Sequence, residues 1–110
     1  MYENNTLYVS DLDGTLLNDS SILSPVTERT LNELIADGAL FTIATARTPA
    51  TVAGILRDVT MTIPAIVMTG ASLWDKNSGH YTRMRFFDRE AVSKVVEIYR
   101  ATDTSSFIFT

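Results

Sequence analysis

The sequence contains no cysteine, and this absence limits both its chemistry and its expected location. Without thiols the chain can form neither a disulfide framework nor a thiolate metal site, and the composition fits a reducing compartment. We therefore expect a cytoplasmic protein. Only three of the 110 residues are proline and 45% are hydrophobic, which is typical of a globular domain rather than a disordered segment.

Long hydrophobic runs and clusters of positive charge are also missing. No segment approaches the roughly 18 apolar residues of a membrane-spanning helix, and the N-terminal MYENNT lacks the basic start of a signal peptide. The nine lysines and arginines are scattered along a chain with net charge −4, whereas nucleic-acid-binding domains usually carry a basic patch. We expect neither a membrane nor a nucleic-acid partner.

Three short apolar runs, residues 7–9, 40–44 and 65–68, predict β-strands. The runs are rich in branched and aromatic side chains and nearly uninterrupted by polar ones. This pattern is typical of parallel strands that are buried on both faces.

Two helices are predicted between these strands. Ser24 and Thr48 are N-capping residue types, and each precedes a proline, which is favoured at the first helical position. Gly38 is expected to end the first helix. The apolar residues expected to face the core are Val26, Leu31, Leu34 and Ile35 in the first helix and Val52, Ile55, Leu56 and Val59 in the second. The βαβαβ order predicts an α/β, Rossmann-like parallel sheet with helices on both faces.

The pattern changes after the third strand. Residues 72–74 and 81–87, joined by the turn 75–79, predict a β-hairpin. Asp88 is expected to cap a further helix with apolar residues at helical spacing. Residues 106–110 predict the beginning of another strand.

The stretch YVSDLDGTLL places Asp11 and Asp13 directly after the first predicted strand. One interpretation is structural, because Asp13-Gly14 between apolar residues is a common two-residue hairpin turn. Two facts oppose it: Asp is rare in strands, and the later βα units require parallel neighbours for the first strand.

A functional interpretation explains both carboxylates. Side chains two residues apart in an extended segment project to the same side, so Asp11 and Asp13 can reach one small volume. Mg²⁺, which binds carboxylates, water and phosphate oxygens, would relieve their repulsion. The nearer carboxylate can attack phosphorus, and the second can protonate the leaving alkoxide and then deprotonate water. Gly14 allows the chain to turn sharply beside the phosphate.

The ends of the other predicted strands carry suitable partners for this chemistry. Parallel strands present their carboxyl ends at one edge, where α/β proteins bind ligands. The three strand ends read Ser10-Asp11, Thr45-Ala46-Arg47 and Thr69-Gly70-Ala71. Carboxylates, hydroxyls, a guanidinium and small residues together suit a phosphate and a metal.

The segment DLDGTLL resembles the first motif of the haloacid dehalogenase superfamily, the aspartate-nucleophile phosphatases. The rest of the chain is similar to the Cof-like branch with a type IIB cap. The helix start ILSP resembles that of the branch, and the second and third strands end in sequences similar to its ATGR and NGA. The resemblance implies a Mg²⁺-dependent phosphomonoester hydrolase that acts on sugar or other small organic phosphates through an aspartyl-phosphate.

The resemblance also implies the roles of individual residues. Asp11 would be the nucleophile and Asp13 the acid–base residue, and Mg²⁺ would be held by the Asp11 carboxylate and the Asp13 main-chain carbonyl. The hydroxyl of Thr45 would contact the phosphoryl oxygens. The full set of substrate-binding candidates is Leu12, Thr45, Ala46, Arg47 and Gly70.

The chain departs from the Cof-like pattern at two positions of the site. Ala46 stands where the branch has glycine, which adds a methyl group near the substrate. Thr69 stands where it has asparagine, which removes an amide that could hold a phosphate or a sugar hydroxyl. We therefore expect an altered substrate fit.

A third departure concerns the extent of the chain. By the resemblance, residues 1–80 are the N-terminal part of the core and residues 81–110 are a hinge and the start of the cap. The remaining cap and the C-terminal core strands are expected to be absent. The superfamily takes a lysine and an acidic cluster from those later strands, and neither Lys76 nor Lys94 lies where that lysine is expected.

Two alternatives follow from this sequence. The chain could be an incomplete, non-catalytic part of such a phosphatase that self-associates or needs a second chain to complete the fold. It could also be a phospho-accepting receiver domain, but that module needs an aspartate after the third strand, where this chain has Val67-Met68-Thr69.

Overall fold

The structure, a computed structural model, describes residues 5–106. In chain order the elements are β1 (Leu7–Ser10), a π-helical turn (Leu12–Leu16), α1 (Pro25–Ala36), β2 (Leu40–Ile43), α2 (Pro49–Ile55), β3 (Ala65–Val67), a 3-10 turn (Met68–Gly70), β4 (Ser72–Asp75), β5 (His80–Met84) and α3 (Arg89–Thr102). This order confirms the predicted α/β class.

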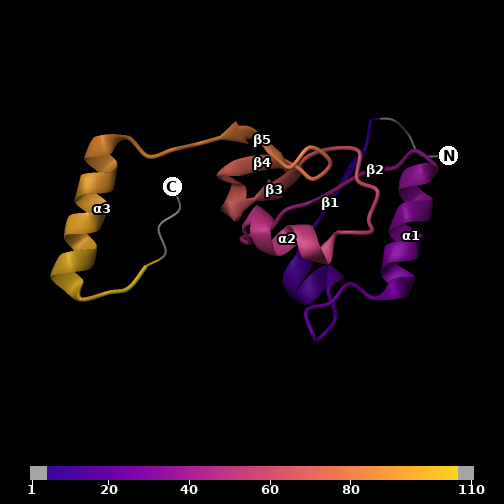
Figure 1. Cartoon of the computed structure of the whole chain (residues 1–110), viewed down its shortest axis with the longest axis horizontal. Coiled ribbons are helices and arrows are strands. Elements are labelled where there is room, and N and C mark those ends of the chain that lie inside the picture. The colour runs from indigo at the N-terminus through magenta and orange to yellow at the C-terminus, as the bar shows by residue number, and fades with distance from the viewer. Residues whose placement is uncertain (1–4, 107–110) are drawn as a thin grey trace.

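The first three strands run parallel, as predicted. Strand β1 pairs with β2 from Leu7 and Leu40 to Ser10 and Ile43, and a parallel bridge between Ala44 and Ile66 joins β2 to β3. The carboxyl ends of β1, β2 and β3 therefore lie along one edge of the molecule. In Figure 1, α1 lies to the right of the three strands and α2 lies below β3.

Strand β4 pairs antiparallel with both β3 and β5. This pairing confirms the predicted hairpin, although β5 ends at Met84 instead of residue 87. The Asp75 carboxylate holds the turn by accepting hydrogen bonds from the backbone N–H groups of Asn77 and Ser78, at 3.1 and 3.3 Å. Hydrogen bonds from Ser78 and Asn77 lower the pKa of Asp75.

The helices begin where the sequence predicts. The Ser24 hydroxyl accepts a hydrogen bond from the Thr27 N–H at 3.1 Å, which satisfies one free donor of the first turn of α1. Thr48 is the N-cap of α2 but makes no side-chain capping bond. Gly38 follows α1 with φ of 100°, a conformation that glycine adopts at little cost.

The hydrophobic core lies between these helices and strands. Its buried side chains come from the loop after β1, both α1 and α2, strands β2 to β4, and the segment before β3. They are Leu12, Leu17, Leu23, Leu31, Ile35, Phe41, Ile43, Val52, Leu56, Val59, Met61, Ala65, Val67 and Trp74.

Some of the expected burial is wrong. Leu7, Tyr8 and Val9 are 44–53% exposed, so β1 is not buried on both faces. Within residues 5–106 its strand partner is β2. On α1, Leu31 and Ile35 are buried whereas Val26 and Leu34 are exposed. The buried stripe of α1 is thus narrower than the sequence predicts.

Helix α3 lies apart from the rest of the molecule (Figure 1). Its Asp88 cap accepts a hydrogen bond from the Ala91 N–H at 2.7 Å, as predicted, but none of its residues is buried. The separation accounts for a radius of gyration of 16.8 Å, against roughly 13 Å for a compact chain of this length.

Two sequence predictions remain outside what the structure tests. Most of the strand predicted at residues 106–110 lies outside the described residues, and Ser106 itself is in no strand. The division into residues 1–80 and 81–110 stays a prediction. No helix within residues 5–106 has the length and apolar character needed to cross a membrane.

Candidate active site at the strand ends

The loop after β1 turns instead of continuing as a strand. Asp11 is extended, a π-helical turn follows it, and Gly14 has φ of 73°. The hairpin interpretation of Asp13-Gly14 is therefore wrong, since β1 pairs with β2 and no strand follows the glycine. The positive φ agrees with the predicted sharp turn at Gly14.

The Asp11 carboxylate is exposed and only partly engaged. Its Oδ1 accepts a hydrogen bond from the Leu12 N–H at 2.7 Å, and within the described residues its Oδ2 accepts none. The side chain of Leu12 is fully buried in the core. Leu12 thus anchors the loop, and its side chain cannot contact a substrate in this arrangement.

The Asp13 carboxylate is engaged at both oxygens. Arg47, which follows β2, donates from Nε to Oδ2 at 2.8 Å and from Nη2 to Oδ1 at 2.7 Å. These hydrogen bonds, with the attraction between the charges, lower the pKa of Asp13 and raise that of Arg47. Asp13 is therefore held as a carboxylate at neutral pH.

Thr45 lies buried between the ends of β2 and β3. Its N–H donates to the Ile66 carbonyl at 3.0 Å, and its carbonyl accepts from the Thr69 N–H at 3.1 Å. The hydroxyl Oγ1 accepts a hydrogen bond from the Arg47 N–H at 3.1 Å. A hydroxyl that accepts in this way keeps its own hydrogen for donation, for example to a phosphoryl oxygen.

Three consecutive residues after β3 adopt left-handed backbone conformations. Met68, Thr69 and Gly70 have φ of 53°, 55° and 87°. Glycine adopts this conformation readily, but for a β-branched residue such as Thr69 it is a genuine outlier. Strain of this kind concentrates at functional sites.

These strand ends surround an open cavity of about 500 Å³. Its lining residues are Asp11, Asp13, Ala44, Thr45, Ala46, Ile66, Thr69 and Gly70. Five of the candidate residues from the sequence therefore line one cavity, whereas Leu12 is buried and Arg47 contacts Asp13. Ala44 and Ile66 were not predicted as lining residues, because each was assigned only to its strand.

The donor set of this cavity fits Mg²⁺. Mg²⁺ commonly binds one or two carboxylates and completes its shell with water and phosphate oxygens, and Asp11 offers an unengaged carboxylate oxygen beside Asp13. No group of three or more His, Cys, Asp or Glu residues that could hold a metal occurs in the described part of the chain. Asp11 and Asp13 are the carboxylates among the lining residues, so Mg²⁺ bound here would complete its shell with water and phosphate oxygens.

Neither lysine contributes to the cavity. Lys76 donates to the Val59 carbonyl and ties the hairpin turn to the segment after α2, while Lys94 pairs with Glu90 on α3 at 2.7 Å. Both positions agree with the expectation that neither is the superfamily's core lysine.

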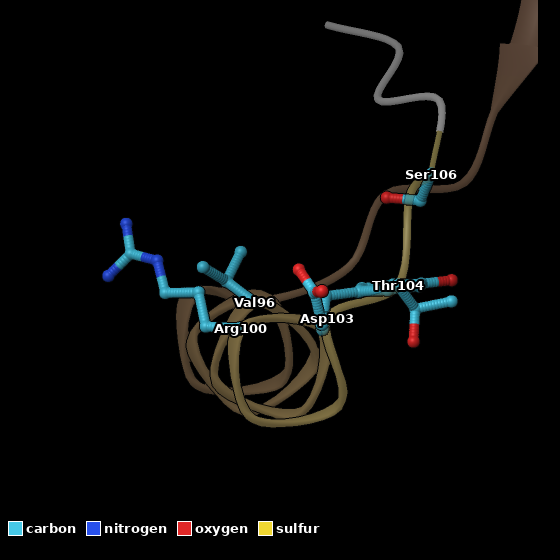
Figure 2. A pocket seen from close by; sticks show the side chains of 6 residues that line it. Val96, Arg100, Asp103, Thr104 and Ser106 are labelled. Carbon is cyan, nitrogen blue, oxygen red and sulfur yellow. The ribbon is translucent and has the colours of Figure 1, made fainter.

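A second hollow, of about 380 Å³, lies at the end of α3 (Figure 2). It is lined by Val96, Tyr99, Arg100, Asp103, Thr104 and Ser106. In Figure 2 the Arg100 side chain extends away from the Asp103 carboxylate. This hollow has one carboxylate and is lined only by the end of α3 and the residues that follow it. The strand-end cavity has two carboxylates and residues from three strand ends, so it is the better candidate for chemistry.

Comparison with known families identifies the fold. The model of the haloacid dehalogenase-like hydrolases matches residues 8–110. The chain belongs to this family. The family match covers the DLDGTLL motif together with both βα units, the hairpin and α3.

Two curated proteins that are similar to this haloacid dehalogenase-like chain are named as phosphatases. A Mycoplasma pneumoniae protein named "Putative phosphatase" is 34% identical over 80 residues, which are 67% of this chain and 28% of the relative. The Bacillus subtilis 5-amino-6-(5-phospho-D-ribitylamino)uracil phosphatase YcsE is 31% identical over 71 residues, 64% of this chain and 28% of the relative. The matched part of this chain thus spans little more than a quarter of these relatives.

Solved structures show the same fold. A haloacid dehalogenase-like hydrolase from B. subtilis has a TM-score of 0.76 and 25% identity over 88% of this chain and 34% of its own. A Bacteroides thetaiotaomicron protein, described among phosphatases of the haloalkanoate superfamily, has a TM-score of 0.75 and 23% identity over 88% of this chain and 35% of its own.

Proposed function

We propose that the protein is a Mg²⁺-dependent phosphomonoester hydrolase that acts on sugar or other small organic phosphates through an aspartyl-phosphate. The observation that carries this proposal is the convergence of Asp11, Asp13 and Thr45 on one cavity at the carboxyl ends of parallel strands. The name of the B. subtilis relative, a phosphatase for a phosphate ester on a sugar-derived chain, supports the substrate class.

The side chains of the cavity can divide the reaction into two steps. An Asp11 carboxylate oxygen attacks phosphorus and forms the acyl phosphate while the ester oxygen leaves as an alkoxide. Asp13 is a carboxylate while it is paired with Arg47, so it must first leave the guanidinium and take up a proton from water. It then donates that proton to the alkoxide, and the product leaves as an alcohol. Asp13 then removes a proton from the water that attacks the acyl phosphate, which releases inorganic phosphate and restores Asp11.

The remaining groups position the phosphoryl group. The Thr45 hydroxyl can donate to a phosphoryl oxygen because it already accepts from the Arg47 N–H. Ala46 and Gly70 line the cavity with little steric bulk. Bound Mg²⁺ would supply charge stabilisation of the phosphoryl oxygens.

The proposed partner is a small phosphate ester. None of the lining residues of the cavity is cationic, and the guanidinium of Arg47 is paired with Asp13. Electrostatic stabilisation of the transition state is usually the largest catalytic contribution. We therefore expect the 110-residue chain to bind a phosphoryl analogue on Asp11 more readily than it hydrolyses a phosphate ester.

Beryllofluoride, which imitates a phosphoryl group on aspartate, tests the nucleophile without requiring turnover. Wild-type chain with Mg²⁺ and beryllofluoride should give a bound ¹⁹F NMR signal. Asp11→Asn should abolish the signal because the amide cannot coordinate beryllium as the carboxylate does. Asp19→Asn, an exposed carboxylate in the following loop, is the matched control and should leave the signal unchanged.

Hydrolysis of an aryl phosphate gives the second measurement. Any Mg²⁺-dependent release of the phenol should disappear in Asp11→Asn. A beryllofluoride signal or hydrolysis that survives Asp11→Asn would contradict the nucleophile assignment. Bound signal without hydrolysis would identify the chain as a binding-competent part of a phosphatase.

A further inference from the structure

Arg47 is held by hydrogen bonds of its backbone as well as by those of its guanidinium. Its N–H donates to Thr45 Oγ1 at 3.1 Å, and its carbonyl accepts from the Met68 N–H at 2.9 Å. Its guanidinium contacts both oxygens of Asp13, at 2.7 and 2.8 Å. Hydrogen bonds through Arg47 thus connect the segment after β3 to the loop after β1.

The fork of Arg47 makes the two carboxylates of the site different. Both oxygens of Asp13 accept from the guanidinium, whereas Asp11 keeps one oxygen without a hydrogen-bond partner in the described residues. A bidentate guanidinium fixes the plane of a carboxylate, which a single ammonium cannot do. The Asp13 carboxylate is therefore held in one orientation.

Without this restraint a divalent cation would attract both carboxylates. Asp11 and Asp13 line the same cavity, and Mg²⁺ readily binds two carboxylates. A carboxylate bound to a divalent cation is a weak base, so an Asp13 ligand would not take up the proton that the proposed reaction needs. The proposed chemistry requires that only one of the two carboxylates binds the metal.

We propose that Arg47 is a positioning residue, whose fork holds the Asp13 carboxylate in one orientation and keeps it off the metal. This inference rests on the proposed function and adds a role for a residue outside the cavity lining. It assigns Arg47 to Asp13 in the resting site, in place of the direct substrate contact expected from the sequence.

Metal affinity separates this role from a merely structural one. Loss of a structural contact would weaken metal binding, whereas release of Asp13 should strengthen it. Arg47→Gln in the 110-residue chain should therefore bind Mg²⁺ roughly three- to thirtyfold more tightly than wild type, as measured by calorimetry. Arg47→Lys keeps the charge but loses the fork, and it should give a smaller gain in affinity.

A double-mutant cycle separates the effect of the Arg47 charge on Mg²⁺ affinity from the effect of releasing Asp13. Arg47→Gln deletes one positive charge near the metal, which favours binding whether or not Asp13 moves. The same substitution in an Asp13→Asn background deletes the same charge but has no carboxylate to release. The gain in Mg²⁺ affinity should be largely absent in that background.

The outcomes distinguish this inference from the proposed function. Equal gains in both backgrounds, or weaker binding by Arg47→Gln with unchanged amide NMR spectra of the core, would overturn the role of Arg47 alone. Mg²⁺ binding by no variant, or binding that survives Asp11→Asn, would overturn the metal site of the proposed function and the inference with it. A protected Arg47 Nε–H NMR signal that disappears in Asp13→Asn would support the pair in solution, and its absence in wild type would contradict it.

Discussion

Thr45 and Thr69 are joined by a backbone hydrogen bond of 3.1 Å from the Thr69 N–H to the Thr45 carbonyl. The bond connects the ends of β2 and β3 at the cavity, and Thr69 makes it with φ of 55°. The geometry of the site thus depends on a β-branched residue in a conformation that such residues rarely adopt.

Thr69→Asn should stabilise the protein. Left-handed backbone costs most residues about 1–2 kcal/mol, and asparagine tolerates it best after glycine. We expect the free energy of unfolding to rise by about 0.5–1 kcal/mol, or roughly 2–6 °C in Tm. Urea denaturation measures the change. Thr69→Val keeps the β-branch and is the control, and an equal gain in that variant would contradict the strain argument.

Ser24→Ala and Thr48→Ala should differ in their effect on stability. Both residues are N-caps before a proline, but only Ser24 accepts a side-chain capping bond. Loss of that bond should lower the free energy of unfolding by about 1 kcal/mol, whereas Thr48→Ala should change it by only a few tenths of that amount. Equal losses in urea denaturation would show that the two caps are equivalent.

The ion pair of Asp13 and Arg47 should make stability depend on pH. Because folding lowers the pKa of Asp13, the pair stabilises the folded state above the ordinary carboxyl pKa, about 3.9. That contribution is lost as the pH falls through the lower pKa of the folded state. Wild type should therefore exceed Asp13→Asn in stability at neutral pH, with a difference that shrinks below about pH 4.

Urea denaturation of both variants across this pH range measures the difference. Other carboxylates titrate in the same range, but they are shared by both proteins and cancel in the comparison. Arg47→Gln should lose the same pH-dependent component. A difference between wild type and Asp13→Asn that stays constant down to pH 2 would contradict the assignment.

Chymotrypsin should cut the chain between β5 and α3. Phe86 and Phe87 are 75% and 77% exposed and lie in a segment without regular structure, which favours proteolysis. Mass spectrometry should find an N-terminal fragment that ends at one of these residues, while the buried Phe41 and Trp74 resist. The Phe86→Ala/Phe87→Ala double variant should lose this cut, and early cleavage after Phe41 would contradict the structure.

Most of the fold could be predicted because its signals are local. The cap-plus-proline pairs at Ser24 and Thr48 predicted both helix starts, and Gly38 predicted the end of α1. The apolar runs predicted the parallel strands. The burial of β1 could not be predicted from its own sequence. Apolar side chains indicate that a strand tends to be buried, but they do not show which helices or strands pack against it.

The candidate site could be predicted in part. The carboxyl ends of parallel strands lie at one edge of a sheet, and this predicts that Asp11, Asp13 and Thr45 lie there, because the prediction depends only on parallel topology. The contact between Arg47 and Asp13 depends on how two loops meet, and the left-handed Thr69 depends on the path of the chain after β3. Neither leaves a periodic signal in the sequence.

The position of the single tryptophan determines what spectroscopy will report. Trp74 is buried in the core, so its fluorescence follows the unfolding of the sheet and of the helices packed on it. Helix α3 buries no residue, and an isolated helix of 14 residues is marginally stable. The far-UV circular dichroism signal includes the contribution of α3, whereas the emission of Trp74 does not report on this helix. The two signals should therefore melt at different temperatures, with the earlier loss in the dichroism.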